Sequence, residues 1–462
     1  MDRVQPPLAF IPPNFNPWVW RCAKLALPFW RRSRAAIRDV RADNIDRLAE
    51  LYQQFQSGKI RLMVAFRHPT ARDPLCLAEL IWNLLPRVAR ERGIDLQSPI
   101  HFHFIYDRGI PLWAGSFVGW GFSQLGGTPI HRGKLDWVGL KSARDLFANG
   151  QFPLAAAPEG GTNGHNEIVS PLEPGVAQLG FWCVEDLLAV GRWEEVWIVP
   201  LGIRYSYIDP PWQAIESLLA QLEAEIGQSS QPLPATATRE EILYHRLFGL
   251  GSNLLVRMEQ FYRRFYDRPL PADAALPGSN EELANRLQAL LHEMLTVAEE
   301  FFHLRSKGNF IDRCRRLEQA GWDRIYREDV DRLQALSPIE RSLADRVAEE
   351  SNFHIWHMRV VENFIAVTGR YVRENPTAER FADMSSILWQ TTRQIQNRSS
   401  SRPPRLGEQR AHLTVGEPIS VTARWESYQG NRRRAKQAVA DLTEDLQVAL
   451  ERTIDPIPCV GK

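Results

Sequence analysis

The sequence predicts an α/β fold, a mixed sheet flanked by helices, with a large all-α insertion before the closing strand. Short apolar runs such as 62–66 and 196–203 are bounded by charged residues, Gly or Pro, as is typical of buried strands. Apolar residues at helical spacing follow the first run, over 73–88. Residues 206–405 have few strand signals and several long amphipathic patterns, which predict a largely helical region.

Composition narrows the class of protein. The 462 residues suffice for two or three domains, and a hydrophobic content of 44% is ordinary for a globular chain. A formal net charge of +1 argues against a general affinity for nucleic acid. Five widely spaced cysteines, without a CxxC pair, predict neither disulfides nor a metal site and suit a reducing cytosol. The sequence has no apolar run long enough for a transmembrane helix, so none is predicted, and the N-terminus lacks a secretory pattern.

One histidine and one aspartate stand where the first strand gives way to a helix. The strand 62–66 ends just before His68, and Asp73 with the following proline opens the helix. A carboxylate beside an imidazole fixes its tautomer and stabilises the imidazolium, so the pair can act as a general base. Asp followed by Pro is also an ordinary helix start. The pair by itself leaves both interpretations open.

Three further segments follow in order. They are 126–133 (GGTPIHRG), 155–162 (AAAPEGGT) and 196–203 (VWIVPLGI). Together with His68-x4-Asp73, this set resembles the four motifs of the glycerolipid acyltransferases that convert 1-acylglycerol 3-phosphate to phosphatidic acid. The resemblance covers 60–205, and 414–419 (TVGEPI) resembles the closing strand of that family. It implies a glycerol-phosphate acyltransferase-like fold.

The resemblance also implies roles for single residues. His68 would be the general base and Asp73 its orienting partner. Acceptor and phosphate binding would fall to Arg132, Glu159, Gly160, Gly161, Thr162 and Gly127, with Arg67, Arg72 and Lys134 as further cations. Arginine suits phosphate because its guanidinium binds in a bidentate fork. Glycines permit a close backbone approach, and their exposed amides bind anions.

The activity implied is an O-acyltransferase of phospholipid biosynthesis. It would move a fatty acyl group from acyl-coenzyme A or an acylated acyl carrier protein to the hydroxyl of a lysophospholipid, with no tightly bound cofactor or metal. Two departures from the family pattern matter: Arg67 stands where the family has Asn or Ser, and, after an extra Gly161, Asn163 stands where it has arginine. The second removes a cation from the site expected to bind the acceptor's phosphate. A neutral acceptor (diacylglycerol, a glycolipid or an isoprenoid alcohol) is therefore an alternative. A non-catalytic, membrane-associated scaffold that binds acyl lipids is another.

We expect four regions along the chain: an interfacial, amphipathic segment (1–43), the α/β acyltransferase core (44–205), the helical insertion (206–405), and the closing strand with a C-terminal helix (406–462). Residues 17–32 mix aromatic, aliphatic and basic side chains, which suits a lipid headgroup region. Packing of this helix on the enzyme's own core is equally consistent with the pattern. A lipid substrate favours a cytoplasmic protein that is peripheral (monotopic) on the membrane surface.

The remaining elements follow from local patterns. We expect helices over 44–55, 136–149 and 432–452, a helix start near 174, and strands over 100–105 and 411–421. His101 and His103 share a face of their strand, but no third ligand is apparent, so we expect structural roles. Residues 112–125, rich in Trp, Phe and Gly, fit either core packing or a wall of an acyl-chain channel.

Overall fold

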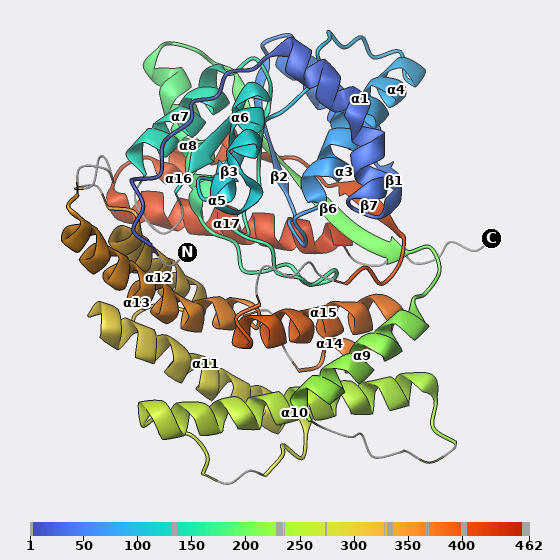
Figure 1. Cartoon of the computed structure of the whole chain (residues 1–462). Helices are drawn as coiled ribbons and strands as arrows, with labels where there is room; N and C mark the ends of the chain where they lie inside the picture. Colours follow the sequence, from blue (N-terminus) through green and yellow to red (C-terminus); the bar gives the residue numbers. More distant parts are fainter. Residues whose placement is uncertain are drawn as a thin grey trace. The chain divides into compact units, whose positions relative to one another are not determined.

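The computed structural model (Figure 1) describes residues 3–131, 136–227, 234, 236–272, 275–327, 329, 336–365, 367, 369–398 and 404–454. The chain divides into two compact units. The α/β unit holds residues 9–208 and the chain from 408 onward, and the helical unit holds the chain up to 8 and residues 209–407. Within the described residues, no helix is both long and apolar enough to cross a bilayer.

A single sheet organises the α/β unit. Its strands are β1 (Ile37–Asp43), β2 (Ile60–Phe66), β3 (His103–Asp107), β4 (Gly127–Ile130), β5 (Leu154–Ala156), β6 (Glu195–Tyr207), β7 (Gln409–Val415) and β8 (Ile419–Ser420). Their order is β1-β7-β6-β2-β5-β3-β4, and β8 pairs with β6. The strands β6, β2, β5, β3 and β4 are mutually parallel, whereas β7 runs antiparallel to β6. Five carboxyl ends therefore meet at one edge.

Helices cover both faces of this sheet (Figure 1). They are α1 (Pro17–Ser33), α2 (Ile45–Gln56), α3 (Asp73–Glu79), the π-turn η1 (Leu80–Leu84), α4 (Leu85–Glu91), α5 (Ile110–Ala114), α6 (Ser116–Gln124), α7 (Trp137–Asn149), α8 (Gly175–Ala189), the 3₁₀ turn η3 (Thr422–Arg424), α16 (Trp425–Tyr428) and α17 (Arg432–Ile454). Alternate residues of β2 pack on α1–α4 or on α7, α8 and α17. Because both faces are covered, every residue of β2 is buried, and all but Arg61 are apolar.

The path of the chain changes direction beside β2. From β2 the chain passes over β5 to β3 and continues outward to β4. It then returns to β5 and passes over β2 to β6, so the connections that leave β2 and β5 diverge to opposite faces. Open α/β sheets bind ligands outside the carboxyl ends of strands at such a switch point. The topology thus favours a site at the ends of β2 and β5.

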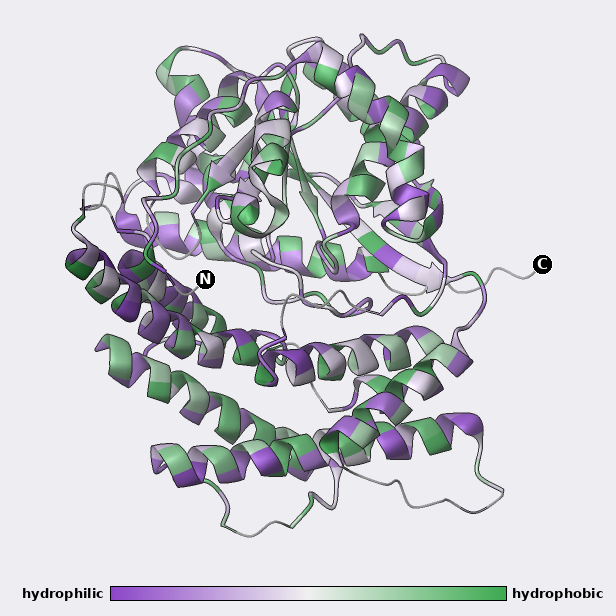
Figure 2. Ribbon diagram, in the orientation of Figure 1, coloured by the Kyte–Doolittle hydropathy of each residue, from purple (hydrophilic) through white to green (hydrophobic). Residues whose placement is uncertain are grey.

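The helical unit lies between β6 and β7 in sequence. Its helices are α9 (Trp212–Ile226), α10 (Arg239–Tyr266), α11 (Asn280–Phe302), α12 (Phe310–Ile325), α13 (Pro338–Glu362), α14 (Tyr371–Glu374) and α15 (Ala378–Ile395). Several begin with capping boxes, such as Thr238 with Glu241 on α10, which satisfy the first free amides. Figure 2 shows apolar and polar residues alternating along α10 and α11, as the amphipathic patterns predict.

The predicted fold class is confirmed: the protein is α/β, with a mixed, mostly parallel sheet and a largely helical segment between β6 and β7.

Two strands of the sheet, β1 and β4, were not predicted from the sequence. β1 is an edge strand in which charged residues outnumber apolar ones, which hides its period. β4 contains Gly127 and Pro129, and the sequence assigned this stretch to a turn. Residues 112–125 form α5 and α6, and Phe117 and Trp120 are exposed on α6.

Candidate active site

His68 and Asp73 meet just beyond the carboxyl end of β2. Nδ1 of His68 lies 2.8 Å from Oδ2 of Asp73. β2 ends at Phe66 and Asp73 is the first residue of α3, so the turn between them brings the two side chains face to face. Asp73 is fully buried, whereas 21% of the His68 side chain is exposed. The site therefore presents an accessible imidazole on a buried carboxylate.

The Asp73 carboxylate accepts hydrogen bonds on both oxygens. Oδ2 accepts from the Thr70 amide (2.9 Å) as well as from His68, and Oδ1 accepts from the hydroxyls of Thr70 (3.1 Å) and Tyr205 (2.5 Å). No side-chain cap hydrogen bond is formed at the start of α3. Of the two interpretations open from sequence, orientation of the histidine fits these contacts better than helix capping.

Tyr205, on β6, holds the carboxylate from the far side. Its hydroxyl also lies 3.4 Å from Sγ of Cys76. Burial, and secondarily the negative charge of Asp73, raise the pKa of Tyr205 well above its ordinary value, so the hydroxyl keeps its proton and donates. Tyr205 could not be predicted as a site residue, because it lies 132 residues beyond Asp73 and tyrosines in β-strands are usually core residues.

The carboxylate defines the tautomer of His68. An acceptor at Nδ1 places the ring proton there and leaves the lone pair on Nε2. Within the described part of the chain, no hydrogen-bond partner is found for Nε2 of His68. The Phe66 ring stands edge-on to the imidazole, with centroids 5.8 Å apart, and limits its rotation. Nε2 can thus accept a proton from a hydroxyl group that reaches the exposed side of the ring.

Arg67 plays a structural part that differs from the expected phosphate contact. Its guanidinium is completely buried and donates to four backbone carbonyls, those of His165, Asn166, Ile168 and Ile203, at 2.5–2.9 Å. A guanidinium enclosed in this way has no surface left for a ligand. Arg67 fastens the 165–168 segment to the end of β2 and to β6.

Glu159 is also enclosed, although the resemblance placed it in the acceptor site. Its carboxylate accepts from the amides of His68 (2.7 Å) and Ser170 (2.9 Å) and from Nδ2 of Asn163 (3.1 Å). Burial raises the pKa of Glu159, and nearby Arg67 opposes that shift. Nδ2 of Asn163 also donates to the carbonyl of Ile168 (2.7 Å), so one amide holds both Glu159 and the chain that follows it.

The predicted glycines also have structural roles. Gly127 is buried within β4, where a Cβ would lie 2.5 Å from the Phe104 ring. Gly160 has φ +69°, and its amide donates to the carbonyl of Ala157, closing the turn after β5. Neither glycine needs a ligand to explain its presence. Gly161 is half-buried and Thr162 is exposed, so these two remain candidates for contact with an acceptor.

The expected cations divide into three groups. Arg72 is half-buried, donates to the carbonyl of Ala35 (3.1 Å) and stacks on Tyr205, 4.9 Å from its ring centroid. It lies beside the His68–Asp73 pair and remains a candidate. Arg67 is enclosed, as described above. Arg132 and Lys134 lie outside the described residues.

Among the described residues, no group of three or more His, Cys, Asp or Glu side chains could hold a metal ion. His101 accepts from Trp82 (2.9 Å) and bonds to the Leu125 carbonyl (2.7 Å), and burial lowers its pKa to about 3. It is a neutral core residue, in keeping with the structural role predicted from the sequence.

Comparison with protein-family models, curated proteins and solved structures finds no match to this chain.

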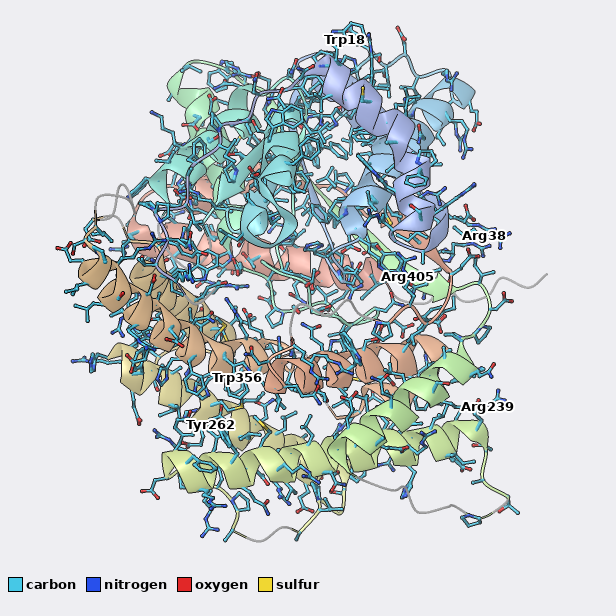
Figure 3. The ribbon with its side chains drawn as sticks, in the orientation of Figure 1. Trp18, Arg38, Arg239, Tyr262, Trp356 and Arg405 are labelled. Carbon is cyan, nitrogen blue, oxygen red and sulfur yellow. The ribbon has the colours of Figure 1, made fainter. Side chains whose placement is uncertain are left out.

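The four hydrogen bonds from Arg67 to backbone carbonyls, which we call the Arg67 clamp, predict a large loss of stability when the guanidinium is removed. Arg67→Met leaves four buried carbonyls without their donor, and we expect a loss of about 3 kcal/mol or more. Arg38→Met is the matched control, because Arg38 lies on the surface (Figure 3) in an exposed pair with Glu408 and should contribute less than about 1 kcal/mol. Chemical denaturation and amide hydrogen exchange of residues 163–170 measure both effects. Equal unfolding midpoints would contradict the clamp.

Proposed function

We propose that the protein is an O-acyltransferase that transfers a fatty acyl group from an acyl thioester to the hydroxyl of a lysophospholipid. The observation that carries the proposal is the oriented imidazole of His68, held by the buried Asp73 at the switch point of the sheet. The order and spacing of the four segments between 60 and 205 support the same activity. Acyl-coenzyme A or an acylated acyl carrier protein would be the donor, and 1-acylglycerol 3-phosphate the acceptor.

The geometry suits a direct transfer without a covalent enzyme intermediate. Nε2 of His68 takes the proton from the acceptor hydroxyl while its oxygen attacks the thioester carbonyl carbon. Asp73 stabilises the imidazolium that forms. The tetrahedral intermediate collapses with cleavage of the C–S bond, and the imidazolium returns its proton to the departing thiolate. The products are an ester and a free thiol, and general-base catalysis contributes about 100- to 10,000-fold.

A neutral acceptor is the second candidate, and a specific observation favours it. Two of the groups that the resemblance assigns to acceptor binding, the Arg67 guanidinium and the Glu159 carboxylate, are bound by the protein itself. Asn163 supplies no charge where the family has a cation. Phosphate binding would then depend on Arg72 and on the sequence candidates Arg132 and Lys134.

The first helix offers a surface for a lipid membrane. One stripe of α1 packs inward through Trp20, Ala23 and Leu27. The opposite stripe is apolar and exposed, and consists of Trp18, Leu25 and Phe29 (Figure 3 marks Trp18). The two interpretations of residues 17–32, packing on the protein's own core and contact with lipid headgroups, therefore each fit one face of the helix. Aromatic and aliphatic side chains exposed beside basic residues settle at the headgroup level of a bilayer, so we propose a peripheral contact there.

Removal of the imidazole tests the catalytic assignment. We expect His68→Ala to lower kcat for acyl transfer at least 100-fold, because no other described group replaces the base. His245→Ala removes an exposed histidine of α10 and should leave kcat unchanged. Release of thiol from acyl-coenzyme A in the presence of a lysophospholipid measures the rate. Full turnover by His68→Ala, with an unaltered melting curve, would refute the mechanism.

A pair of acceptors that differ only in phosphate tests the substrate class. We expect 1-acylglycerol 3-phosphate to be acylated in preference to 1-acylglycerol, and Arg132→Ala to raise its KM about 10- to 100-fold, the equivalent of one charged hydrogen bond. The KM for the thioester should not change. Preference for the neutral acceptor, with no effect of Arg132→Ala on its KM, would favour the second candidate.

Substitution of the exposed stripe tests the membrane contact. The triple variant Trp18→Ser, Leu25→Ser, Phe29→Ser changes side chains that are 70%, 83% and 68% exposed, so the fold should persist. We expect its partition onto phosphatidylglycerol vesicles to fall at least tenfold in a co-sedimentation assay. Trp193→Ser is the control, since Trp193 is 82% exposed outside α1. A loss of binding by the control alone would place the contact elsewhere.

A further inference from the structure

The helical unit contains a cavity that the proposed reaction does not use. It lies among α10, α11, α13, α14 and α15, and the volume open to the centre of a water molecule is ≈ 110 Å³. In this measure about 10–15 Å³ hold one water. The cavity is therefore several times larger than a packing defect. All of its lining residues belong to the helical unit.

The lining is apolar along almost its whole extent. Leucine, valine, phenylalanine and methionine side chains form it, and none of the lining residues is charged. Among them are Leu254, Leu287, Met294, Phe364 and Met384. Methionine side chains are unbranched and adapt to irregular shapes, as in other sites that accept flexible apolar ligands. Such a surface suits an aliphatic chain and leaves water without hydrogen-bond partners.

One polar group at the cavity has no partner within the described residues. Asn280, the first residue of α11, lines the cavity and is 91% buried, since its exposure is 9%. Its Oδ1 accepts from the Tyr244 hydroxyl at 2.5 Å, but its Nδ2 is buried without a hydrogen bond. The Tyr371 hydroxyl at the same cavity is satisfied by Asp383 (2.8 Å). A buried N–H group of this kind costs free energy unless an acceptor meets it.

We propose that this cavity binds the free fatty acid form of an aliphatic chain, with its carboxylate on Nδ2 of Asn280. The apolar lining would hold the chain, and the amide would supply the donor that the carboxylate needs. Asn280 also stands at the N-terminus of a 23-residue helix, whose positive end favours an anion. The binding does not rest on acyl transfer at His68, because every residue that it uses lies on the helical unit.

Two ligands with the same chain and opposite head groups test the inference. Dodecanoate carries only acceptors on its head group, whereas dodecylammonium carries only donors and cannot accept from Nδ2. We expect the full-length protein to bind dodecanoate at least tenfold more tightly in equilibrium dialysis below the micellar concentration. Equal affinities, or the absence of saturable binding, would overturn the proposal whether or not the protein transfers acyl groups.

Asn280→Asp isolates the head group. The new carboxylate still accepts from Tyr244 and suits a first helical turn, so the fold should persist. It replaces the donor by a negative charge, and we expect the preference to invert in favour of dodecylammonium. Asn285→Asp adds the same charge at an exposed position of α11 and should leave both affinities unchanged. An unchanged preference in Asn280→Asp would place the ligand elsewhere.

Gly251→Phe tests whether the aliphatic chain of the ligand occupies this cavity. Gly251 lines the cavity on α10, and a Cβ there would meet no atom within 4 Å. A phenyl group at this position can enter the cavity without displacing a neighbour, and replacement of a helical glycine favours the fold. We expect Gly251→Phe to abolish dodecanoate binding, and Gly251→Ala, which adds one methyl group, to retain it. Retention of binding by Gly251→Phe, with an unaltered circular dichroism spectrum, would exclude this cavity.

Discussion

The buried carboxylate of Asp73 is the contact on which the site depends. It joins the turn after β2 through Thr70, the imidazole of His68, and β6 through the hydroxyl of Tyr205. A carboxylate removed from water is costly unless its lone pairs are used, and here both oxygens accept. Satisfaction of this one group therefore holds the base, the start of α3 and β6 in a fixed relation. The reactive nitrogen gains its orientation from the same contacts that stabilise the fold.

A second layer of contacts holds the segment behind the base. Arg67 and Glu159 follow adjacent parallel strands and carry opposite charges, yet each is satisfied mainly by backbone groups. Asn163 completes this layer by bracing Glu159. The buried arginine before His68 and the amide after the Pro-Glu-Gly turn thus belong to one arrangement. Their common effect is to fix the 163–170 segment and to enclose the charges of Arg67 and Glu159 in the interior.

Sequence reasoning succeeded where a single local rule determines the structure. The apolar run of β2 and the Asp-Pro start of α3 require no distant partner, so this strand and this helix could be predicted, whereas the pairing of His68 with Asp73 was expected only from the resemblance. It failed where tertiary contacts decide. β1 owes its existence to pairing with β7, more than 350 residues later, and not to its own charged sequence. The enclosure of Arg67 depends on carbonyls 98–136 residues away, which no motif spacing encodes.

The stability of the helical unit depends on whether its apolar cavity is empty or occupied. The cavity among its helices is partly open and leaves apolar side chains and the Nδ2 of Asn280 without partners. A larger side chain at Gly251 would meet no atom near its Cβ, so close packing does not require a glycine there. A ligand that binds only the folded protein adds about 2.7 kcal/mol of stability at 100 times its Kd. An aliphatic carboxylate would cover the apolar lining and pair with Nδ2, and would therefore stabilise the helical unit.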